Sequence, residues 1–335
     1  MTTTPLLALT LGDPTGIGPE VSFACLRSRA VRASARLVVC GPAELRPLDV
    51  PLVERSGDAL SREVGEGEAA WLATEGSGPW QVGRAQREGG VAALGALRAG
   101  HELALAGTVD GIVTAPVCKE ALHLAGEPVE GQTELLGKWC GVDDHQMLAV
   151  VGELRVLLLT RHMPLRDALD AITPERVVRH LHLLHRALGE LGIASPRIAL
   201  AGLNPHAGEG GILGREELDL LAPALERARS EGLTVSGPHS PDTIFAAAAK
   251  GAHDGVLALY HDQAFIPIKL IGEGRAVTVI TGLPYLRVSP AHGTAHDIAG
   301  QGIARADDLE NAILHAAGWA VLRRSGGASA APARA

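Results

Sequence analysis

The sequence has 335 residues, of which 46% are hydrophobic, 3% are aromatic and 41 are glycine, and its formal net charge is −8. This length is sufficient for two domains with a substantial core. The negative charge and the lack of a clustered Lys/Arg run argue against nucleic acid as the main partner. The four cysteines form no Cys-x-x-Cys pair, which argues against a disulfide framework and against a thiolate zinc site.

The N-terminal residues 1–11 lack a basic region, and their apolar run is too short for a signal peptide or a membrane span. We therefore expect a cytoplasmic protein with reduced thiols and no membrane partner. The apolar positions are mostly Ala, Leu, Val and Ile, with few aromatic residues. This composition favours an α/β fold, in which helices cover a parallel sheet.

In chain order, short apolar runs alternate with longer segments of helical spacing. Strands are expected at 6–10, 36–41, 109–116, 147–151, 154–160, 197–203, 254–260 and 276–281. Helices are expected from Pro19, over 90–106, from Thr173 to Gly192, over 223–230 and over 307–323. The two runs on either side of Gly152 indicate a hairpin.

Three other parts of the chain are expected at the surface. Residues 53–90 are polar with little periodicity, which favours a surface segment with short edge strands. His180, His182 and His185 lie on one predicted helix and are expected to be surface residues rather than ligands. The Ala/Ser/Pro-rich residues 325–335 predict a disordered tail.

A glycine-rich turn, Gly12 to Glu20, connects the first strand to the first helix. Such a turn can present backbone N–H groups to an anion. It matches neither the dinucleotide fingerprint G-x-G-x-x-G nor the phosphate loop that ends in Gly-Lys-Ser/Thr. By itself the turn identifies no ligand.

Three histidines each follow an apolar strand-like run, although they are far apart in the sequence: His162, His206 and His261. The carboxyl ends of strands in one sheet can bring such side chains to one rim. Three neutral imidazoles bind zinc and similar divalent metals and leave coordination positions free for a substrate oxygen. The pattern favours an open metal site, with three unrelated loop histidines as the alternative.

Charged residues in the same half of the chain suit a small anionic substrate. Lys269 and Arg287 could hold a phosphate or carboxylate, and Asp242 lies in a neighbouring segment. From residues alone, the sequence predicts a metal-assisted enzyme that acts on a small anion, without revealing the reaction.

Four longer motifs stand out in the chain: Gly12-Asp-Pro-Thr-Gly-Ile-Gly-Pro-Glu20, Asn204-Pro-His-Ala-Gly-Glu-Gly-Gly211, Tyr260-His-Asp-Gln263 with Pro267-Ile-Lys269, and Gly282-Leu-Pro-Tyr-Leu-Arg287 through His292-Gly-Thr294. With these motifs the sequence resembles the 4-hydroxythreonine-4-phosphate dehydrogenase family of pyridoxal phosphate biosynthesis. The resemblance extends from about Leu7 to Leu314.

The resemblance implies roles for individual residues. His162, His206 and His261 match the family's ligands for a divalent metal, which could be Zn, Mg, Mn or Co. Thr133, Lys269 and Arg287 match its substrate contacts, and Asp242 lies in the matching Pro-Asp-Thr segment. At two positions the chain departs from the family: Gln132 replaces a usual histidine, and Thr278 aligns with a usual asparagine. A glutamine cannot carry a proton near neutral pH.

The resemblance also implies a reaction. NAD or NADP would oxidise the 3-hydroxyl of the substrate, a small phosphorylated hydroxy amino acid, and the keto acid would then lose its carboxylate to give 3-amino-2-oxopropyl phosphate. The metal would stabilise negative charge on the substrate oxygens. The proton acceptor stays open between Lys269, Asp242 and a metal-bound water, and no residue is assigned to the nicotinamide cofactor.

The implied fold has two α/β/α domains around a central cleft, as in isocitrate and isopropylmalate dehydrogenases. We expect residues 1–128 and 268–335 to form a first, discontinuous domain and residues 129–267 to form a second domain with dimer contacts. Family members are homodimers whose metal ligands come from both subunits, so a homodimer with a shared active site is expected.

Three alternatives stay open. A related enzyme that acts on D-threonate or D-erythronate 4-phosphate would share most motifs, and Gln132 and Thr278 keep that alternative open. A metal-free enzyme similar to phosphate acyltransferases would not need the three histidines. A non-catalytic binding protein would show no NAD(P)-dependent turnover.

Overall fold

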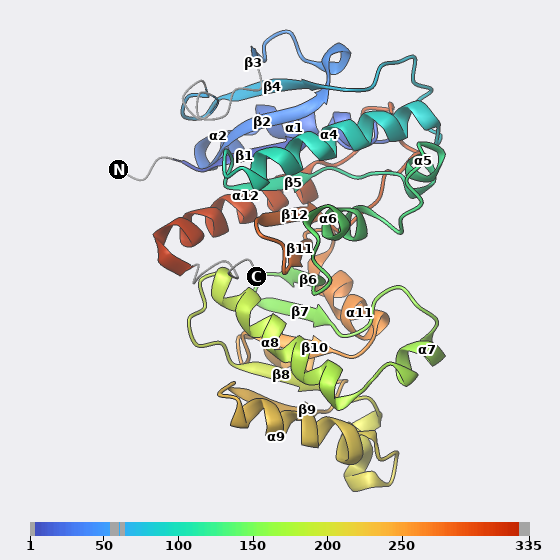
Figure 1. Cartoon of the computed structure of the whole chain (residues 1–335), viewed down its shortest axis with the longest axis vertical. Coiled ribbons are helices and arrows are strands. Elements are labelled where there is room, and N and C mark those ends of the chain that lie inside the picture. Colours follow the sequence, from blue (N-terminus) through green and yellow to red (C-terminus); the bar gives the residue numbers. More distant parts are fainter. Residues whose placement is uncertain (1–3, 54–59, 61–63, 328–335) are drawn as a thin grey trace. The chain divides into compact units, whose positions relative to one another are not determined.

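The computed structural model describes residues 4–53, 60 and 64–327. The chain divides into two compact units: unit 1 comprises residues 1–143 and 283–321, and unit 2 comprises residues 144–282 and 322–335. Each unit is a sheet with helices packed on it (Figure 1). The α/β class predicted from the sequence is confirmed.

Unit 1 is built on strands that all run parallel to their neighbours, in the order β3-β4-β2-β1-β5-β12. The strands are β1 (Leu6–Thr10), β2 (Arg36–Pro42), β3 (Leu52–Val53), β4 (Ala69–Thr74), β5 (Gly111–Thr114) and β12 (Leu286–Pro290). The helices are α1 (Gly18–Arg27), α2 (Arg29–Ser34), η1 (Ala43–Leu45), α4 (Arg87–Leu105), α5 (Lys119–Leu124), α6 (Gln132–Cys140) and α12 (Asp307–Leu322). Because the strands are parallel, the carboxyl ends of β1, β5 and β12 meet at one edge.

The segment 53–90 contains a buried strand, β4, which pairs with β2 from Leu37–Ala69 to Pro42–Thr74. Trp71 at its centre is fully buried, and its indole Nε1 donates to the Gly41 carbonyl oxygen at 3.1 Å. The expectation of a surface segment is therefore wrong for β4. This strand has only six residues, which is too short for its burial to appear as a hydrophobic periodicity in the sequence. Residues 54–59 and 61–63 lie outside the described residues.

Unit 2 is a mixed sheet with the order β11-β6-β7-β10-β8-β9. Strand β6 is antiparallel to β11 and β7, and the other neighbours are parallel. The strands are β6 (Gln146–Val151), β7 (Leu154–Leu158), β8 (Ile198–Ala201), β9 (Val235–His239), β10 (Gly255–Ala258) and β11 (Val277–Thr281). The helices are α7 (Leu165–Asp170), α8 (Pro174–Glu190), η2 (Pro205–Gly211), η3 (Glu217–Leu221), α9 (Ala222–Ser230), α10 (Ile244–Ala249), α11 (His261–Gly272) and η4 (Arg323–Gly327).

Local sequence signals explain two of these elements. Gly152 takes a left-handed conformation (φ 54°) in the turn between β6 and β7, which confirms the predicted hairpin. Helix α8 begins where the Thr173 hydroxyl accepts a hydrogen bond from the Arg176 amide at 3.2 Å. This is an N-cap followed by proline at the first helical position, as the sequence predicts.

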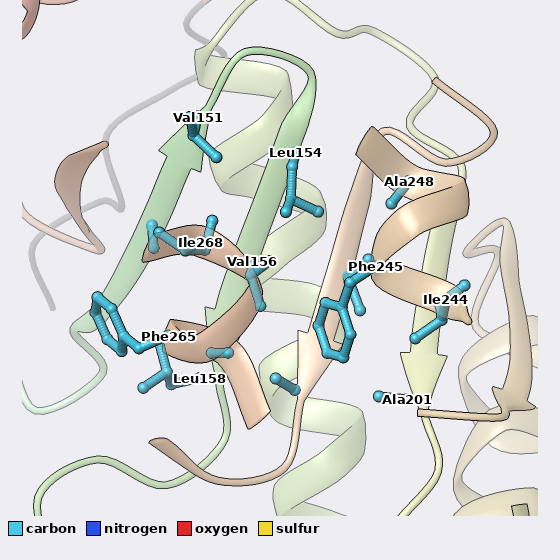
Figure 2. Close-up of a cluster of buried hydrophobic side chains, with 14 of the residues drawn as sticks. Val151, Leu154, Val156, Leu158, Ala201, Ile244, Phe245, Ala248, Phe265 and Ile268 are labelled. Carbon is cyan, nitrogen blue, oxygen red and sulfur yellow. The ribbon is translucent and has the colours of Figure 1, made fainter. Parts of the chain in front are cut away.

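The core of unit 2 fixes helix α11 on the sheet. Figure 2 shows Phe265 and Ile268 of α11 packed against Val156 and Leu158 of β7, with Phe245 of α10 beside them. These side chains are at most 7% exposed. Because α11 begins directly after β10, this packing fixes the position of the polar residues at its start.

Helix α8 contains a histidine that is buried, contrary to the expectation of a surface position. His180 is 2% exposed, and its Nδ1 and Nε2 lie 2.8 Å from the Arg176 carbonyl oxygen and 3.0 Å from Gln146 Nε2. Burial lowers the pKa of His180 to about 4. The helical spacing puts His180 on the face that packs on the sheet, next to Val177 and Leu181.

The unit boundaries fall at 143/144 and 282/283, whereas the sequence analysis places them at 128/129 and 267/268. Helix α6 belongs to unit 1, and α11 and β11 belong to unit 2, where β11 pairs with β6. Of the tail expected to be disordered, residues 325–327 belong to η4, and the expectation for residues 328–335 lies outside the described residues. No helix among the described residues is both long and apolar enough to cross a membrane.

Candidate active site

The three histidines singled out in the sequence follow three neighbouring strands of unit 2. Strand β10 lies between β7 and β8 and runs parallel to both. His162 follows β7, His206 follows β8 and His261 follows β10. All three therefore lie beyond the carboxyl ends of adjacent strands, where ligands bind in α/β sheets.

His162 and His261 are close together, with ring centroids 5.3 Å apart. They line a cavity of about 320 Å³ that Arg161, Tyr260 and Asp262 also line. His261 is held by Asp262, whose Oδ1 lies 2.7 Å from His261 Nδ1, and by stacking on Phe265. The carboxylate orients the ring, so that Nε2 of His261 is the nitrogen available for a ligand.

His206 lies in a segment of unusual backbone conformation. His206, Ala207 and Glu209 all have positive φ angles, between 46° and 54°. The buried Glu217 carboxylate anchors the start of this segment, because it accepts hydrogen bonds from the Leu203 and Asn204 amides at 2.8 and 2.7 Å. The left-handed residues begin at His206, directly after this anchored start, and non-glycine residues in such conformations cluster at functional sites.

The electrostatics at Glu217 support this anchoring role. Burial would raise the pKa of Glu217, but hydrogen bonds from Asn204 and Leu203 outweigh burial and lower it. The side chain is therefore a carboxylate at neutral pH. It fixes the loop that carries His206 rather than exchanging protons.

Asp242 and Lys269 are exposed residues of unit 2. Asp242 accepts a hydrogen bond from the Ser240 hydroxyl at 2.6 Å, and this bond, with the nearby His206 charge, lowers the pKa of Asp242. Lys269 Nζ lies 6.0 Å from the centre of the Phe265 ring. His261, Phe265 and Lys269 are spaced four residues apart, so they share one face of α11.

The sequence predictions for substrate contacts fall mostly in unit 1. Arg287 of β12 is buried, and its Nη2 donates to the Thr114 hydroxyl at 2.7 Å. Gln132, the first residue of α6, donates from Nε2 to the carbonyl oxygen of Ala115 at 3.1 Å. Arg287 and Gln132 therefore meet consecutive residues at the end of β5, and Thr133 is buried beside Gln132.

Two polar atoms of this group are buried without a hydrogen-bond partner among the described residues: Arg287 Nε and Gln132 Oε1. Burial lowers the pKa of Arg287 to about 10, which leaves the guanidinium charged at neutral pH. A buried, charged donor with a free N–H suits an anionic ligand. Thr278 is the second residue of β11 in unit 2 and is buried opposite Ala149.

The described residues of the single chain do not bring His162, His206 and His261 around one point. Instead, the group whose ligand atoms all lie within 4.8 Å of one another is Asp13, Cys118 and His296 of unit 1. Sequence reasoning missed this group because its members are more than a hundred residues apart and share no spacing motif. Only the fold of unit 1 brings them together.

Comparisons with known proteins match nearly the whole chain. A relative from Synechococcus sp. (strain JA-3-3Ab), named 4-hydroxythreonine-4-phosphate dehydrogenase, is 42% identical over 332 residues, covering 93% of this chain and 94% of the relative. A relative from Symbiobacterium thermophilum is 39% identical over 333 residues, covering 97% of this chain and 99% of the relative. It carries the provisional name D-threonate 4-phosphate dehydrogenase.

Solved structures agree with these relatives. The crystal structure of 4-hydroxythreonine-4-phosphate dehydrogenase from Klebsiella pneumoniae superposes with a TM-score of 0.83 at 36% identity, covering 95% of this chain and 98% of that chain. The family model described as "Pyridoxal phosphate biosynthetic protein PdxA" matches residues 25–316. The chain therefore belongs to the pyridoxal phosphate biosynthetic protein PdxA family.

Proposed function

We propose that this protein is a cytoplasmic dehydrogenase that uses NAD or NADP to oxidise the 3-hydroxyl of 4-phospho-4-hydroxythreonine. The resulting 3-keto acid then loses its carboxylate as CO2 and gives 3-amino-2-oxopropyl phosphate. Family membership and the relatives named 4-hydroxythreonine-4-phosphate dehydrogenase support the reaction class. The observation that carries the proposal is the position of three histidines beyond three adjacent strand ends of unit 2.

His162 and His261, with His206, would hold a divalent metal such as Zn, Mg, Mn or Co. The 5.3 Å between the first two rings lets a nitrogen of each reach a common ion. A bound metal would withdraw electron density from the substrate hydroxyl and carboxylate oxygens. Asp262 keeps His261 oriented for this role through its 2.7 Å contact with Nδ1.

Arg287 would bind the anionic group of the substrate, with Gln132 and Thr133 beside it. Its unpartnered, buried Nε would gain the hydrogen bond that it lacks when an anion is present. The unpartnered Oε1 of Gln132 can accept a hydrogen bond from a hydroxyl or ammonium group of the substrate. Lys269 and Thr278 of unit 2 are proposed as further substrate contacts, the first as a positive charge and the second through its hydroxyl.

The proton transfers are assigned to Asp242 and Lys269. Oxidation sends a hydride to the nicotinamide and a proton to a base, and loss of CO2 leaves an enolate carbon that takes up a proton. The lowered pKa of Asp242 makes this carboxylate a weak base that is ionised at neutral pH. Lys269, as an ammonium group, is suited to return the proton to carbon.

A second candidate function is oxidation of D-threonate 4-phosphate or D-erythronate 4-phosphate by the same chemistry. Relatives from Symbiobacterium thermophilum and Halalkalibacterium halodurans carry the D-threonate 4-phosphate name at 39% and 37% identity. Gln132 favours this candidate, because an amide stands where the family usually has a histidine. 4-Phospho-4-hydroxythreonine carries an amino group where D-threonate 4-phosphate and D-erythronate 4-phosphate carry a hydroxyl, and Gln132 would have to recognise this group.

We further propose a homodimer that shares its active sites. Helix α11 exposes Ile266, Leu270 and Ile271 next to an apolar cavity of about 410 Å³. Leu270 is 73% exposed and Ile266 is 59% exposed. A contiguous apolar surface of this kind is typical of an interface between subunits. A partner subunit could supply the histidine that one chain does not bring to His162 and His261.

The test is NAD(P)H formation by purified, metal-replete protein offered 4-phospho-4-hydroxythreonine, D-threonate 4-phosphate and D-erythronate 4-phosphate side by side. Preference for the amino substrate, lost in His206→Ala, would support the first candidate. His182→Ala is the matched control, because His182 is a half-buried histidine of α8 that is paired with Glu231, directly after α9. Reduction with none of the three substrates would contradict the dehydrogenase proposal and favour a transferase.

A further inference from the structure

We propose that Asp13, Cys118 and His296 of unit 1 form a second, thiolate-containing site for a zinc-class divalent metal, separate from the three histidines of unit 2. The ligand atoms of these three side chains all lie within 4.8 Å of one another. The site combines a carboxylate, a thiol and an imidazole, one from each of three separate segments. This inference does not depend on the proposed reaction.

The fold places these residues at the carboxyl edge of the unit 1 sheet. Asp13 follows β1, Cys118 follows β5 and His296 follows β12. Strand β5 is paired in parallel with both β1 and β12, so the three segments leave the sheet side by side. Asp13 donates its amide to the Pro116 carbonyl at 3.0 Å, which joins the first two segments directly.

Asp13 provides an independent indication of a missing ligand. Its side chain is 0% exposed. Oδ1 accepts hydrogen bonds from the Thr15 amide and hydroxyl at 2.9 and 2.7 Å, whereas Oδ2 has no hydrogen-bond partner of normal geometry among the described residues. A buried carboxylate oxygen without a partner is costly, and a cation would compensate it.

The spacing fits a metal after a small adjustment. Ligands around a tetrahedral zinc ion are separated by roughly 3.3–3.6 Å, so separations of up to 4.8 Å would shorten by about 1.5 Å at most. His296 can move most easily, because its side chain is partly exposed and the segment between β12 and α12 is irregular. Its Nε2 already lies 3.2 Å from the Thr15 hydroxyl.

The ligand set determines which metals would bind. A thiolate with an imidazole selects Zn, Co and similar ions over Mg and Ca, which prefer oxygen ligands. Three protein ligands would leave a coordination position open, as in catalytic zinc sites. Cys118 is also suited to this role among the cysteines, because Cys25 and Cys40 are fully buried.

The experiment is a Co2+ titration of the metal-free full-length protein, followed by the near-ultraviolet absorption that arises from thiolate-to-cobalt charge transfer. We expect this band to saturate at one Co2+ per chain, to disappear in Cys118→Ser and to be displaced by Zn2+ but not by Mg2+. His206→Ala should keep the band, because a site made of histidines produces no thiolate signal. Cys140→Ser is the matched control and should also keep it.

His296→Leu provides a second test that leaves the thiol in place and alters a partly exposed side chain, so folding is retained. We expect its Co2+ affinity at the thiolate site to fall at least about tenfold. The proposal is wrong if no band forms at saturating Co2+, if the band survives in Cys118→Ser, or if the His296→Leu affinity is unchanged. None of these outcomes bears on turnover by the three-histidine site.

Discussion

At the scale of single residues, Arg287 offers the sharpest test of substrate binding. In the wild type, the planar guanidinium of Arg287 bonds Thr114 through Nη2 and keeps Nε available for a ligand. Arg287→Lys keeps the positive charge but removes this planar group. Loss of one or two charge-assisted hydrogen bonds corresponds to about 1.5–3 kcal/mol, so we expect KM for the phosphorylated substrate to rise roughly 10- to 100-fold. Steady-state kinetics would measure this change.

The control for Arg287 is Arg197→Lys. Arg197 is an exposed arginine that precedes β8, and it is paired with Asp254 at 3.0 Å. Arg197 lies at the amino end of β8, away from the three histidines. The KM of the Arg197→Lys variant for the phosphorylated substrate should therefore stay at the wild-type value. Equal KM values in wild type and Arg287→Lys would argue against the anion-binding role.

His180 predicts a pH dependence of stability. Its folded-state pKa of about 4 is below the ordinary value of 6.5, so the unfolded chain binds the proton more tightly. The neutral, buried His180 therefore adds to the free energy of unfolding. This contribution is complete above pH 6.5 and is lost as the pH falls toward 4, which lowers the free energy of unfolding by up to about 3 kcal/mol. Urea unfolding at pH 7 and pH 4.5 should show a smaller difference for His180→Gln than for wild type.

His182→Gln is the matched control for this pH effect. His182 lies on the same helix, but its side chain is about one-third exposed and paired with Glu231. It should retain the wild-type difference between the two pH values. Identical pH dependence in His180→Gln and wild type would show that another group carries the effect.

At the scale of elements, the sequence was most informative where a strand ends in a histidine. The apolar runs before His162, His206 and His261 predicted β7, β8 and β10, and the fold makes these strands neighbours. The sequence did not predict helix α11, because Pro267 lies inside that helix. The Asp13, Cys118 and His296 group was beyond reach, since pairing of β5 with β1 and β12 cannot be read from local patterns.

Gly282, at the end of β11, tests whether the strand connection tolerates a side chain. It has φ +85°, and an added Cβ would lie 2.1 Å from the Asp144 carbonyl oxygen. Gly282→Ala combines a left-handed backbone with this clash, so we expect about 2–5 kcal/mol of lost stability. Gly152→Ala has a similar positive φ but open space, and should lose only about 1–2 kcal/mol. Equal losses in urea unfolding would contradict the clash.

At the scale of the whole molecule, the site residues are divided between the two units. The histidines, Asp242, Lys269 and Thr278 belong to unit 2, whereas Gln132, Thr133 and Arg287 belong to unit 1. Each unit is a helix-covered sheet, and the three histidines follow strand ends of unit 2. The domain boundaries expected from the sequence divide these residues differently, with Gln132 and Thr133 beside the histidines and with Lys269 and Thr278 beside Arg287. Composition alone does not say which strand ends carry a ligand.

The proposed homodimer predicts that assembly and activity are lost together. Leu270→Glu puts a charge on the exposed apolar face of α11, and burying that charge in an interface would be costly. Light scattering coupled to size exclusion should report a dimer for wild type and a monomer for Leu270→Glu, with turnover falling in parallel because the active site is shared. Leu48→Glu is the control, since Leu48 is 95% exposed on a loop of unit 1. A monomeric wild type, or a dimeric Leu270→Glu, would refute this interface.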